Sequence, residues 1–225
     1  MGSEIARLYK EKCKREWKTA FLWAFIGFLI IHIYKFTNNL PNHDTLSSFY
    51  SPQDMTVSGR WFLQYVCGIS SYFDLPWLNG ILSAFYLGIT ALLVVELLDI
   101  RNPFVIALSA LILVASPSTT ETLFFGFTAD GYFLGMLLSA FAALLSCKGN
   151  RLWHWAGAGV CLCISCAIYQ SYVTFAAVLC ILYLVLRLIN EEISIGASWR
   201  WIGKHVLTYG ILIHSVLNGM PVSSF

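Results

Sequence analysis

The chain has 225 residues, of which 58% are hydrophobic and only 12% are charged, and its formal net charge is +2. A soluble domain carries about a quarter charged residues, so this composition excludes an ordinary soluble protein. Several apolar runs approach the roughly 20 residues that cross about 30 Å of hydrocarbon as a helix. The sequence therefore predicts an all-α fold: a polytopic transmembrane helical bundle with about seven spans.

The N-terminal part predicts a basic lead, a first span and a long polar loop. Residues 1–18 are rich in Lys and Arg, which suits a cytoplasmic segment on an anionic leaflet. A secretory signal is disfavoured, because the apolar run at 19–37 is long for a signal core and no small-residue cleavage site follows it. The first outer loop is predicted at 38–75. Within it, 60–69 is too short to span and is predicted to lie in the membrane interface as an amphipathic helix.

The rest of the transmembrane region, which ends near 217, contains six more predicted spans. They are about 76–98, 103–115, 131–147, two within 152–189, and 205–217. The stretch 152–189 is twice as long as one helix needs, and its polar interruption at 169–172 predicts a short outer hairpin. A short tail, 218–225, follows the last span. Gly131 and Gly135, four residues apart, predict a close helix contact.

The distribution of charge predicts the orientation of the bundle. Of fourteen Lys and Arg residues, all but Lys35 and Arg60 fall on one side of this arrangement. The positive-inside rule therefore predicts a cytoplasmic N-terminus. The acidic residues of both outer passages, among them Glu121 and Asp130, would then face away from the cytoplasm.

The first outer loop contains residues suited to group transfer. Asp44 and Asp54 are candidate general bases, because a carboxylate within hydrogen-bond reach can deprotonate an incoming hydroxyl. Arg60 suits a phosphate, which a guanidinium binds with paired donors. Tyr50 and Trp61 offer aromatic surfaces to a sugar or lipid. Each residue also has a structural alternative, such as closing a turn, capping a helix or anchoring the loop to lipid head groups.

The second outer passage, 116–131, adds Glu121 as a candidate substrate-binding residue. It could orient acceptor or donor, or bind a divalent cation together with Asp54. No metal site is otherwise predicted, since the cysteines at 161, 163 and 166 lack further ligands nearby in the sequence. P-loop, HExxH, GxSxG and dinucleotide fingerprints are all absent from the sequence, and nothing points to nucleic acid.

Three groups of short motifs resemble a known family when taken in order. The pattern NHD…YSPQDM…SGRWF follows the first span, and ASP…ETLFF and IYQSY come later. Together they resemble the GtrII-type membrane glucosyltransferases, which belong to the GT-C class. The resemblance covers roughly residues 20–190.

The resemblance implies an activity and assigns residues to it. Such enzymes take glucose from a polyprenyl-phosphate carrier on the outer face of the bacterial inner membrane and place it on a surface glycan such as O-antigen, as part of polysaccharide biosynthesis. The essential acid of the first outer loop matches Asp44, with Asp54 as second choice, and the arginine of the GRW motif is Arg60. The expected reaction is a direct, inverting displacement that needs no nucleotide site.

Two alternatives remain open at this point. Family members are commonly longer, so the chain resembles the N-terminal half and could be an inactive, truncated membrane subunit. A flippase or transporter for a lipid-linked sugar is the other alternative. Transporters place charged groups near mid-membrane, whereas the predicted spans here are almost free of charge.

Overall fold

The computed structural model describes residues 15–191, except 39, 41, 49 and 74, and the isolated positions 193, 196, 203 and 210. Every regular element in these ranges is a helix, apart from one isolated β-bridge between Met55 and Arg60. The prediction of an all-α bundle is therefore confirmed. The lead before residue 15, nearly all of the predicted last span and the tail 218–225 lie outside the described residues.

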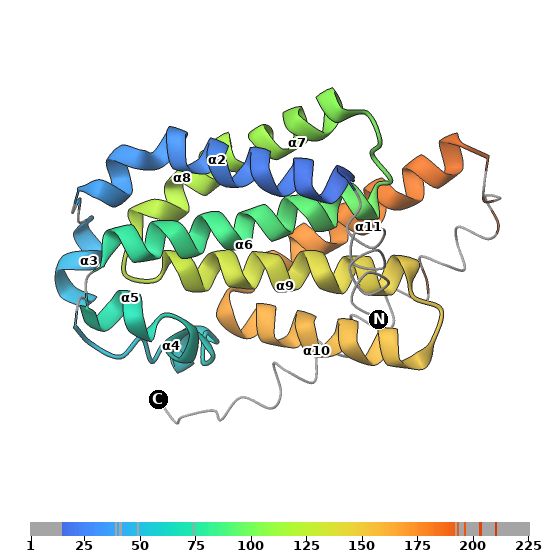
Figure 1. Ribbon diagram of the computed structural model, residues 1–225. Coiled ribbons are helices and arrows are strands. Elements are labelled where there is room, and N and C mark those ends of the chain that lie inside the picture. The colour runs from blue at the N-terminus through green and yellow to red at the C-terminus, as the bar shows by residue number, and fades with distance from the viewer. Residues whose placement is uncertain are drawn as a thin grey trace, which may run out of the picture.

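The described chain contains long helices that lie alongside one another and short helices at one end (Figure 1). The long helices are α2 (Arg15–Thr37), α6 (Pro76–Leu97), α7 (Pro103–Ala115), α9 (Ala129–Lys148), α10 (Leu152–Ile168) and α11 (Tyr172–Ile189). The short ones are α3 (His43–Ser48), η1 (Thr56–Ser58), α4 (Leu63–Val66), α5 (Gly68–Phe73) and α8 (Pro117–Phe124). We call the end that holds α3, α4 and α5 the loop end, and the opposite end the basic end.

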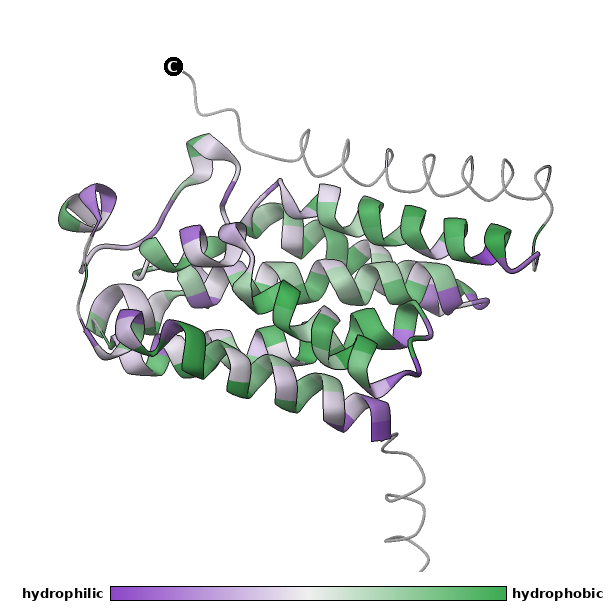
Figure 2. Ribbon diagram, turned by 90° about the horizontal axis from the view of Figure 1, so that it is seen from above, coloured by the Kyte–Doolittle hydropathy of each residue, from purple (hydrophilic) through white to green (hydrophobic). Residues whose placement is uncertain are grey.

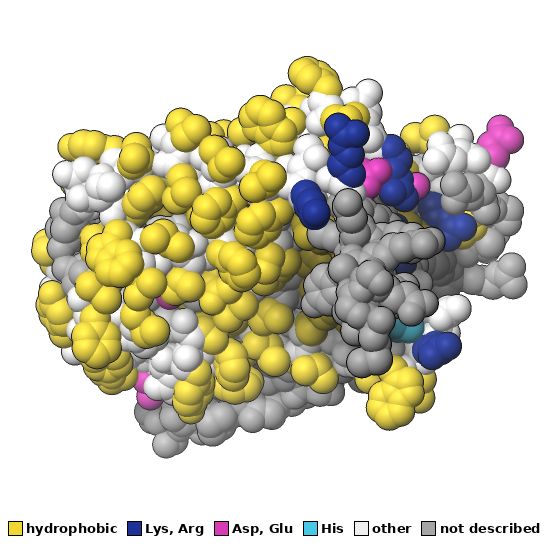
Figure 3. Space-filling view, viewed as in Figure 1, with side chains coloured by type: hydrophobic (Ala, Val, Ile, Leu, Met, Phe, Trp, Pro, Cys, Tyr) yellow, Lys and Arg dark blue, Asp and Glu magenta, His cyan; other side chains and the backbone are white. Residues whose placement is uncertain are grey.

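Length and composition allow five helical stretches of the described chain to cross a membrane. They are 15–37, 76–97, 103–124 (α7 with α8), 129–148 and 172–189. Helix α10 is equally apolar but has 17 residues. Helices α6 and α9 are the most buried and form the centre. The long helices are largely hydrophobic (Figure 2), and hydrophobic side chains cover most of the face shown in Figure 3. Membrane character is thus confirmed, and the number of spans is approximate.

The central contact between α2 and α6 depends on glycines. A Cβ atom at Gly80 would lie 2.5 Å from the Cβ of Phe36, and one at Gly88 would lie 2.8 Å from the ring of Phe21. The absence of these atoms lets the two helices approach closely, which is the usual way in which membrane helices associate.

A bend between α7 and α8 tilts α8 at the loop end. Pro117 has no backbone N–H, so the carbonyl of Leu113 lacks its helical donor. The hydroxyl of Thr119 donates to that carbonyl instead, at 2.9 Å. The next carbonyl, that of Val114, lies 2.8 Å from Nε2 of the buried His32 on α2. The bend is therefore fixed by side chains, and it places one face of α8 beside α9.

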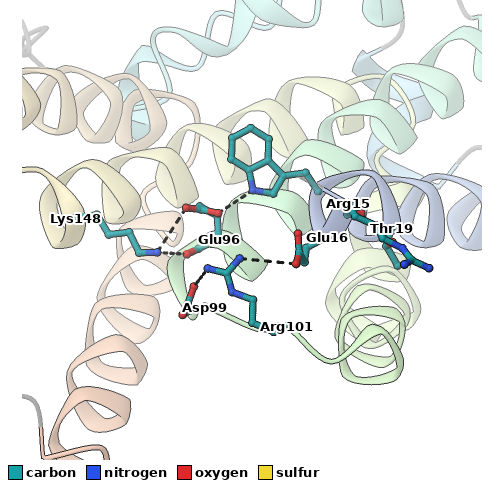
Figure 4. Close-up of polar contacts among 8 residues, drawn as sticks. Arg15, Glu16, Thr19, Glu96, Asp99, Arg101 and Lys148 are labelled. Atoms are coloured by element: carbon teal, nitrogen blue, oxygen red, sulfur yellow. Dashed lines mark hydrogen bonds and ion pairs between the residues drawn. The ribbon is translucent and has the colours of Figure 1, made fainter. Parts of the chain in front are cut away.

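Charged side chains at the basic end join the helices to one another (Figure 4). The indole of Trp17 on α2 donates to Glu96 on α6 at 2.8 Å, and Lys148 on α9 lies 3.7 Å from the same carboxylate. Arg101, in the turn before α7, lies 3.9 Å from Glu16. Contacts at this end thus fix the positions of α2, α6 and α9, which carry the loop end.

Candidate functional site

A pocket of about 480 Å³ lies between α8, α9 and the start of α11, and we call it the Arg60 pocket. Its polar lining includes Arg60, Ser118, Glu121, Thr122, Tyr132, Tyr169, Ser171 and Thr174. Its apolar lining includes Phe125, Phe133, Met136, Phe175 and Val178. The structure thus brings two of the residues singled out in the sequence, Arg60 and Glu121, to one cavity.

Local backbone geometry determines where Arg60 lies. Residues 56–58 form a 3-10 turn that ends at Gly59, whose φ of 74° belongs to the left-handed region that suits glycine. The N–H of Arg60 then donates to the carbonyl of Met55 at 3.0 Å and closes the β-bridge. This compact turn directs the loop back toward the bundle.

Two hydrogen bonds attach this turn to the α10–α11 hairpin. The amide of Gln170 donates to the carbonyl of Ser58 at 2.7 Å, and the N–H of Phe62 donates to the carbonyl of Ala167 at 3.1 Å. The predicted hairpin at 169–172 is confirmed, because α10 ends at Ile168 and α11 begins at Tyr172. The loop and the hairpin therefore form one unit around Arg60.

The segment after Arg60 differs from its prediction. Residues 60–69 were predicted to be a single amphipathic helix in the membrane interface, but they form α4 and the start of α5, separated at Cys67. Leu63 and Cys67 are fully buried and pack in one cluster with Tyr132 and Ile168. Apolar burial against α9 and α10 thus places α4 against the bundle itself.

Three described side chains contact the guanidinium of Arg60: those of Met55, whose sulfur lies 3.9 Å from Nη1, Tyr132 and Tyr169. Its Nη1 donates to the hydroxyl of Tyr132 at 3.1 Å. Its central carbon lies 4.8 Å from the ring centre of Tyr169, within the range of a cation–π interaction. Its Nε is buried and has no hydrogen-bond partner among the described residues. A buried, unpaired donor costs about 1–3 kcal/mol in stability. Because Arg60 lines the pocket, its guanidinium is the cation that an anionic group entering there would meet.

The carboxylates divide between the pocket and the surrounding surface. Glu121, on α8, is the sole carboxylate among the described residues that line the Arg60 pocket. Asp44 lies in the first turn of α3 with 62% of its side chain exposed, 3.5 Å from His43, and Asp54 is exposed in the loop. Neither Asp44 nor Asp54 lines the pocket, so their catalytic roles stay predictions.

The aromatic residues of the pocket are not those singled out in the sequence. Tyr50 is 63% exposed and Trp61 is 38% exposed, and neither lines the cavity. The pocket contains Tyr132 and Tyr169 instead, whose rings lie 5.3 Å apart. The sequence signal for Tyr169 was its place in a polar hairpin between two spans, but nothing in the spacing shows that this hairpin meets Arg60.

Asp130 is an internal residue of the loop end. It is 4% exposed and accepts a hydrogen bond from Ser70 on α5 at 2.7 Å. The neighbouring Ser71 donates to the carbonyl of Phe127 at 2.6 Å. Placed in the first turn of α9, the carboxylate also faces the positive end of that helix. Asp130 thus attaches α5 to α9 and is not a solvated loop charge.

Comparison with known proteins gives the family. The family model described as Glucosyl transferase GtrII matches residues 33–218. The chain belongs to this family. No curated protein and no solved structure matches the chain. The matched region of this GtrII chain includes every residue that lines the Arg60 pocket.

Metal-binding geometry is absent from the described part of the GtrII chain. There, no three His, Cys, Asp or Glu side chains are grouped so that they could hold a metal ion. What the pocket offers is an arginine, a carboxylate, hydroxyls and aromatic rings. This set can bind an anion beside a sugar and can accept a proton.

Proposed function

We propose that this GtrII protein transfers glucose from a polyprenyl-phosphate carrier to a hydroxyl of a cell-surface glycan. The family supports glucosyl transfer in a membrane. The observation that carries the proposal is the pocket itself, which both Arg60 and Glu121 line. A phosphate bound by the guanidinium of Arg60 would leave its attached sugar in the cavity that Glu121 also lines.

The proposed reaction is a single displacement. The acceptor oxygen forms a bond to the anomeric carbon of glucose while the bond from that carbon to the phosphate oxygen breaks. Polyprenyl phosphate leaves with the electron pair, and Arg60 stabilises its charge. The acceptor proton passes to a carboxylate, and attack from the side opposite the leaving group inverts the anomeric configuration.

Two residues are candidates for the base, on different grounds. Position favours Glu121, because it lines the same cavity as Arg60. The family resemblance favours Asp44, with Asp54 as second choice, although both are exposed outside that cavity. We assign the base to Glu121, and leave Asp44 and Asp54 as the alternatives that the experiment must test.

The site is proposed to face away from the cytoplasm of a bacterial inner membrane. Most Lys and Arg side chains of the described chain lie at the basic end, where Figure 3 shows dark blue side chains at one edge of a hydrophobic surface. The positive-inside rule places such an end in the cytoplasm. The loop end, with the Arg60 pocket, would then meet donor and acceptor on the outer face.

The test is transfer by purified protein in liposomes, with polyprenyl-phosphate-glucose and a glycan acceptor. We expect Glu121→Gln to lower kcat by about 10²–10⁴-fold, as removal of a general base does. Asp44→Asn and Asp54→Asn should leave most activity. Asp99→Asn, at the exposed basic end, is the matched control.

The outcomes separate the alternatives. If Asp44→Asn lowered kcat by a comparable factor while Glu121→Gln stayed active, the base would be Asp44 on α3. Absence of transfer by the wild-type chain with any such donor would contradict the proposed function and favour the inactive-subunit alternative.

A further inference from the structure

A second polar pocket, of about 340 Å³, lies at the basic end, and we call it the basic-end pocket. Its polar lining comes from the turn after α6, the last residue of α9, and the last two turns of α11 with the residue that follows them: Asp99, Lys148, Tyr183, Arg187 and Asn190. The Arg60 pocket shares none of these lining residues. The proposed glucosyl transfer therefore makes no use of the basic-end pocket.

Both cations of the basic-end pocket are held in place by neighbouring groups. Lys148 donates to the backbone carbonyl of Glu96, and its Nζ lies 3.7 Å from the carboxylate of that residue (Figure 4). On α11, Nη1 of Arg187 donates to the hydroxyl of Tyr183 at 3.1 Å. Side chains that are already ordered lose little conformational entropy when a ligand binds. Lys148 and Arg187 are thus positioned in advance for an anion between α9 and α11.

The charges of the lining favour a ligand with a single negative charge. Lys148 and Arg187 are positive, and Asp99 is the one carboxylate among the described residues that line the pocket. Outside the lining, Glu96 beside Lys148 and Arg101 beside Asp99 offset one another. The lining therefore has one excess positive charge, which matches a phosphodiester better than a phosphate monoester with its nearly two negative charges.

One wall of the pocket continues onto the hydrophobic outer surface of α11. Leu186 lines the pocket and is 37% exposed. Leu182 and Ile189, on the same face of the helix, are 43% and 70% exposed. A lipid could therefore have its head group at the two cations while its chains stay in the hydrocarbon of the bilayer along α11. A free phosphate would use the cations alone.

We propose that the basic-end pocket binds the head group of an anionic phospholipid of the phosphatidylglycerol class. Its phosphodiester would lie between Lys148 and Arg187, because charged donors form strong hydrogen bonds to phosphate. The hydroxyls of the head group would donate to the carboxylate of Asp99 and the amide oxygen of Asn190. Basic pockets between transmembrane helices on the cytoplasmic side are a known kind of site for anionic head groups. The bound lipid would join the ends of α6, α9 and α11.

The first experiment compares head groups by thermal unfolding of the purified protein in detergent. The additives are phosphatidylglycerol, phosphatidylethanolamine and phosphatidylcholine with the same acyl chains, and inorganic phosphate. Because the chains are identical, a difference among the three lipids comes from the head group. We expect phosphatidylglycerol to raise the unfolding midpoint most, since a ligand that binds the folded state stabilises it and this head group alone combines a net negative charge with hydroxyls.

The second experiment locates the site by native mass spectrometry during a titration with phosphatidylglycerol. Lys148→Gln and Arg187→Gln should each weaken binding about fivefold, the effect of one cation near an anionic lipid. Lys148→Arg keeps the charge and should retain most of the binding. Arg151→Gln is the matched control, because it removes the same charge from an exposed position of the basic end outside the lining, and it should bind like the wild-type chain.

Several outcomes would overturn this assignment. Equal stabilisation by phosphatidylcholine would mean that lipid covers α11 without recognition of its head group. Stronger stabilisation by phosphatidylethanolamine would indicate a zwitterionic ligand, and equal stabilisation by inorganic phosphate would indicate a soluble anion. Unchanged binding in Lys148→Gln and Arg187→Gln, or equal weakening in Arg151→Gln, would exclude the pocket as the site. Neither experiment measures glucosyl transfer, so failure of the proposed function would leave the lipid site unaffected.

Discussion

Arg60 illustrates what a single residue's sequence context can and cannot reveal. Its isolation among acidic outer residues predicted an anion-binding role, and the structure places it in the lining of a pocket. Its partners could not be predicted, because Tyr132 and Tyr169 are 72 and 109 (169 − 60) positions away in the sequence. Such contacts depend on how the loop packs on the hairpin, and hydrophobic periodicity does not encode that.

The substitution Arg60→Lys tests whether the shape of the guanidinium matters besides its charge. Lysine keeps the charge but loses the planar contact with Tyr169 and the paired donors that match a phosphate. We expect kcat/KM for the lipid donor to fall by about 10–100-fold, or roughly 1.4–2.8 kcal/mol. Arg151→Lys, at an exposed position of the basic end, is the control. Equal activities in all three proteins would mean that Arg60 acts as a charge alone.

Contacts between helices were also predicted only in part from the sequence. Gly131 and Gly135 were predicted to be packing positions, and this is confirmed: Gly131 faces Val66 of α4 and Gly135 faces Ile168 of α10. The tighter contact of Gly80 with α2 was not predicted. A glycine in an apolar helix indicates a close approach, but its partner depends on the position of a helix far away in the chain.

We expect Gly80→Ala to lower the stability of the α2–α6 pair. The added Cβ would lie 2.5 Å from the Cβ of Phe36, which is fixed to the backbone of α2, so the helices must separate. Overpacking of this kind costs about 1–3 kcal/mol. Gly157→Ala is the matched control, because its Cβ would meet only the flexible end of Leu145 at 3.3 Å, and alanine favours helix by about 1 kcal/mol.

Thermal unfolding in detergent micelles measures both variants. The midpoint should fall for Gly80→Ala and should stay or rise for Gly157→Ala. A drop of equal size in both would show that the loss does not come from the α2–α6 contact.

For the whole molecule, the sequence predicted the spans better than the loop between them. The spans expected at 19–37 and 76–98 correspond to α2 and α6, because long apolar runs become helices in a membrane wherever they pack. The first outer loop folds through particular contacts, such as the bond from Gln170 to Ser58. The single helix expected there at 60–69 was wrong, since two short helices form instead, with Leu63 buried against the bundle. Its position in the membrane interface stays a prediction.

The orientation of the whole bundle is the remaining prediction, and single cysteines test it in intact cells. Val57→Cys lies at the loop end at an 87% exposed position, and Asn150→Cys lies in the exposed turn at the basic end. An impermeant maleimide should label Val57→Cys in intact cells, and Asn150→Cys only after permeabilisation. The positive charge of the basic end is the physical reason, since the positive-inside rule predicts that such an end lies in the cytoplasm.

The native Cys67 gives little background in this assay, because burial raises the pKa of its thiol to about 12 and maleimides react with the thiolate. Labelling in each variant is measured as the increase over the wild-type chain, and denatured samples show that both new thiols are reactive. If Asn150→Cys were labelled in intact cells and Val57→Cys were not, the bundle would have the opposite orientation. The Arg60 pocket would then open on the cytoplasmic side, where it could not meet a glycan at the cell surface.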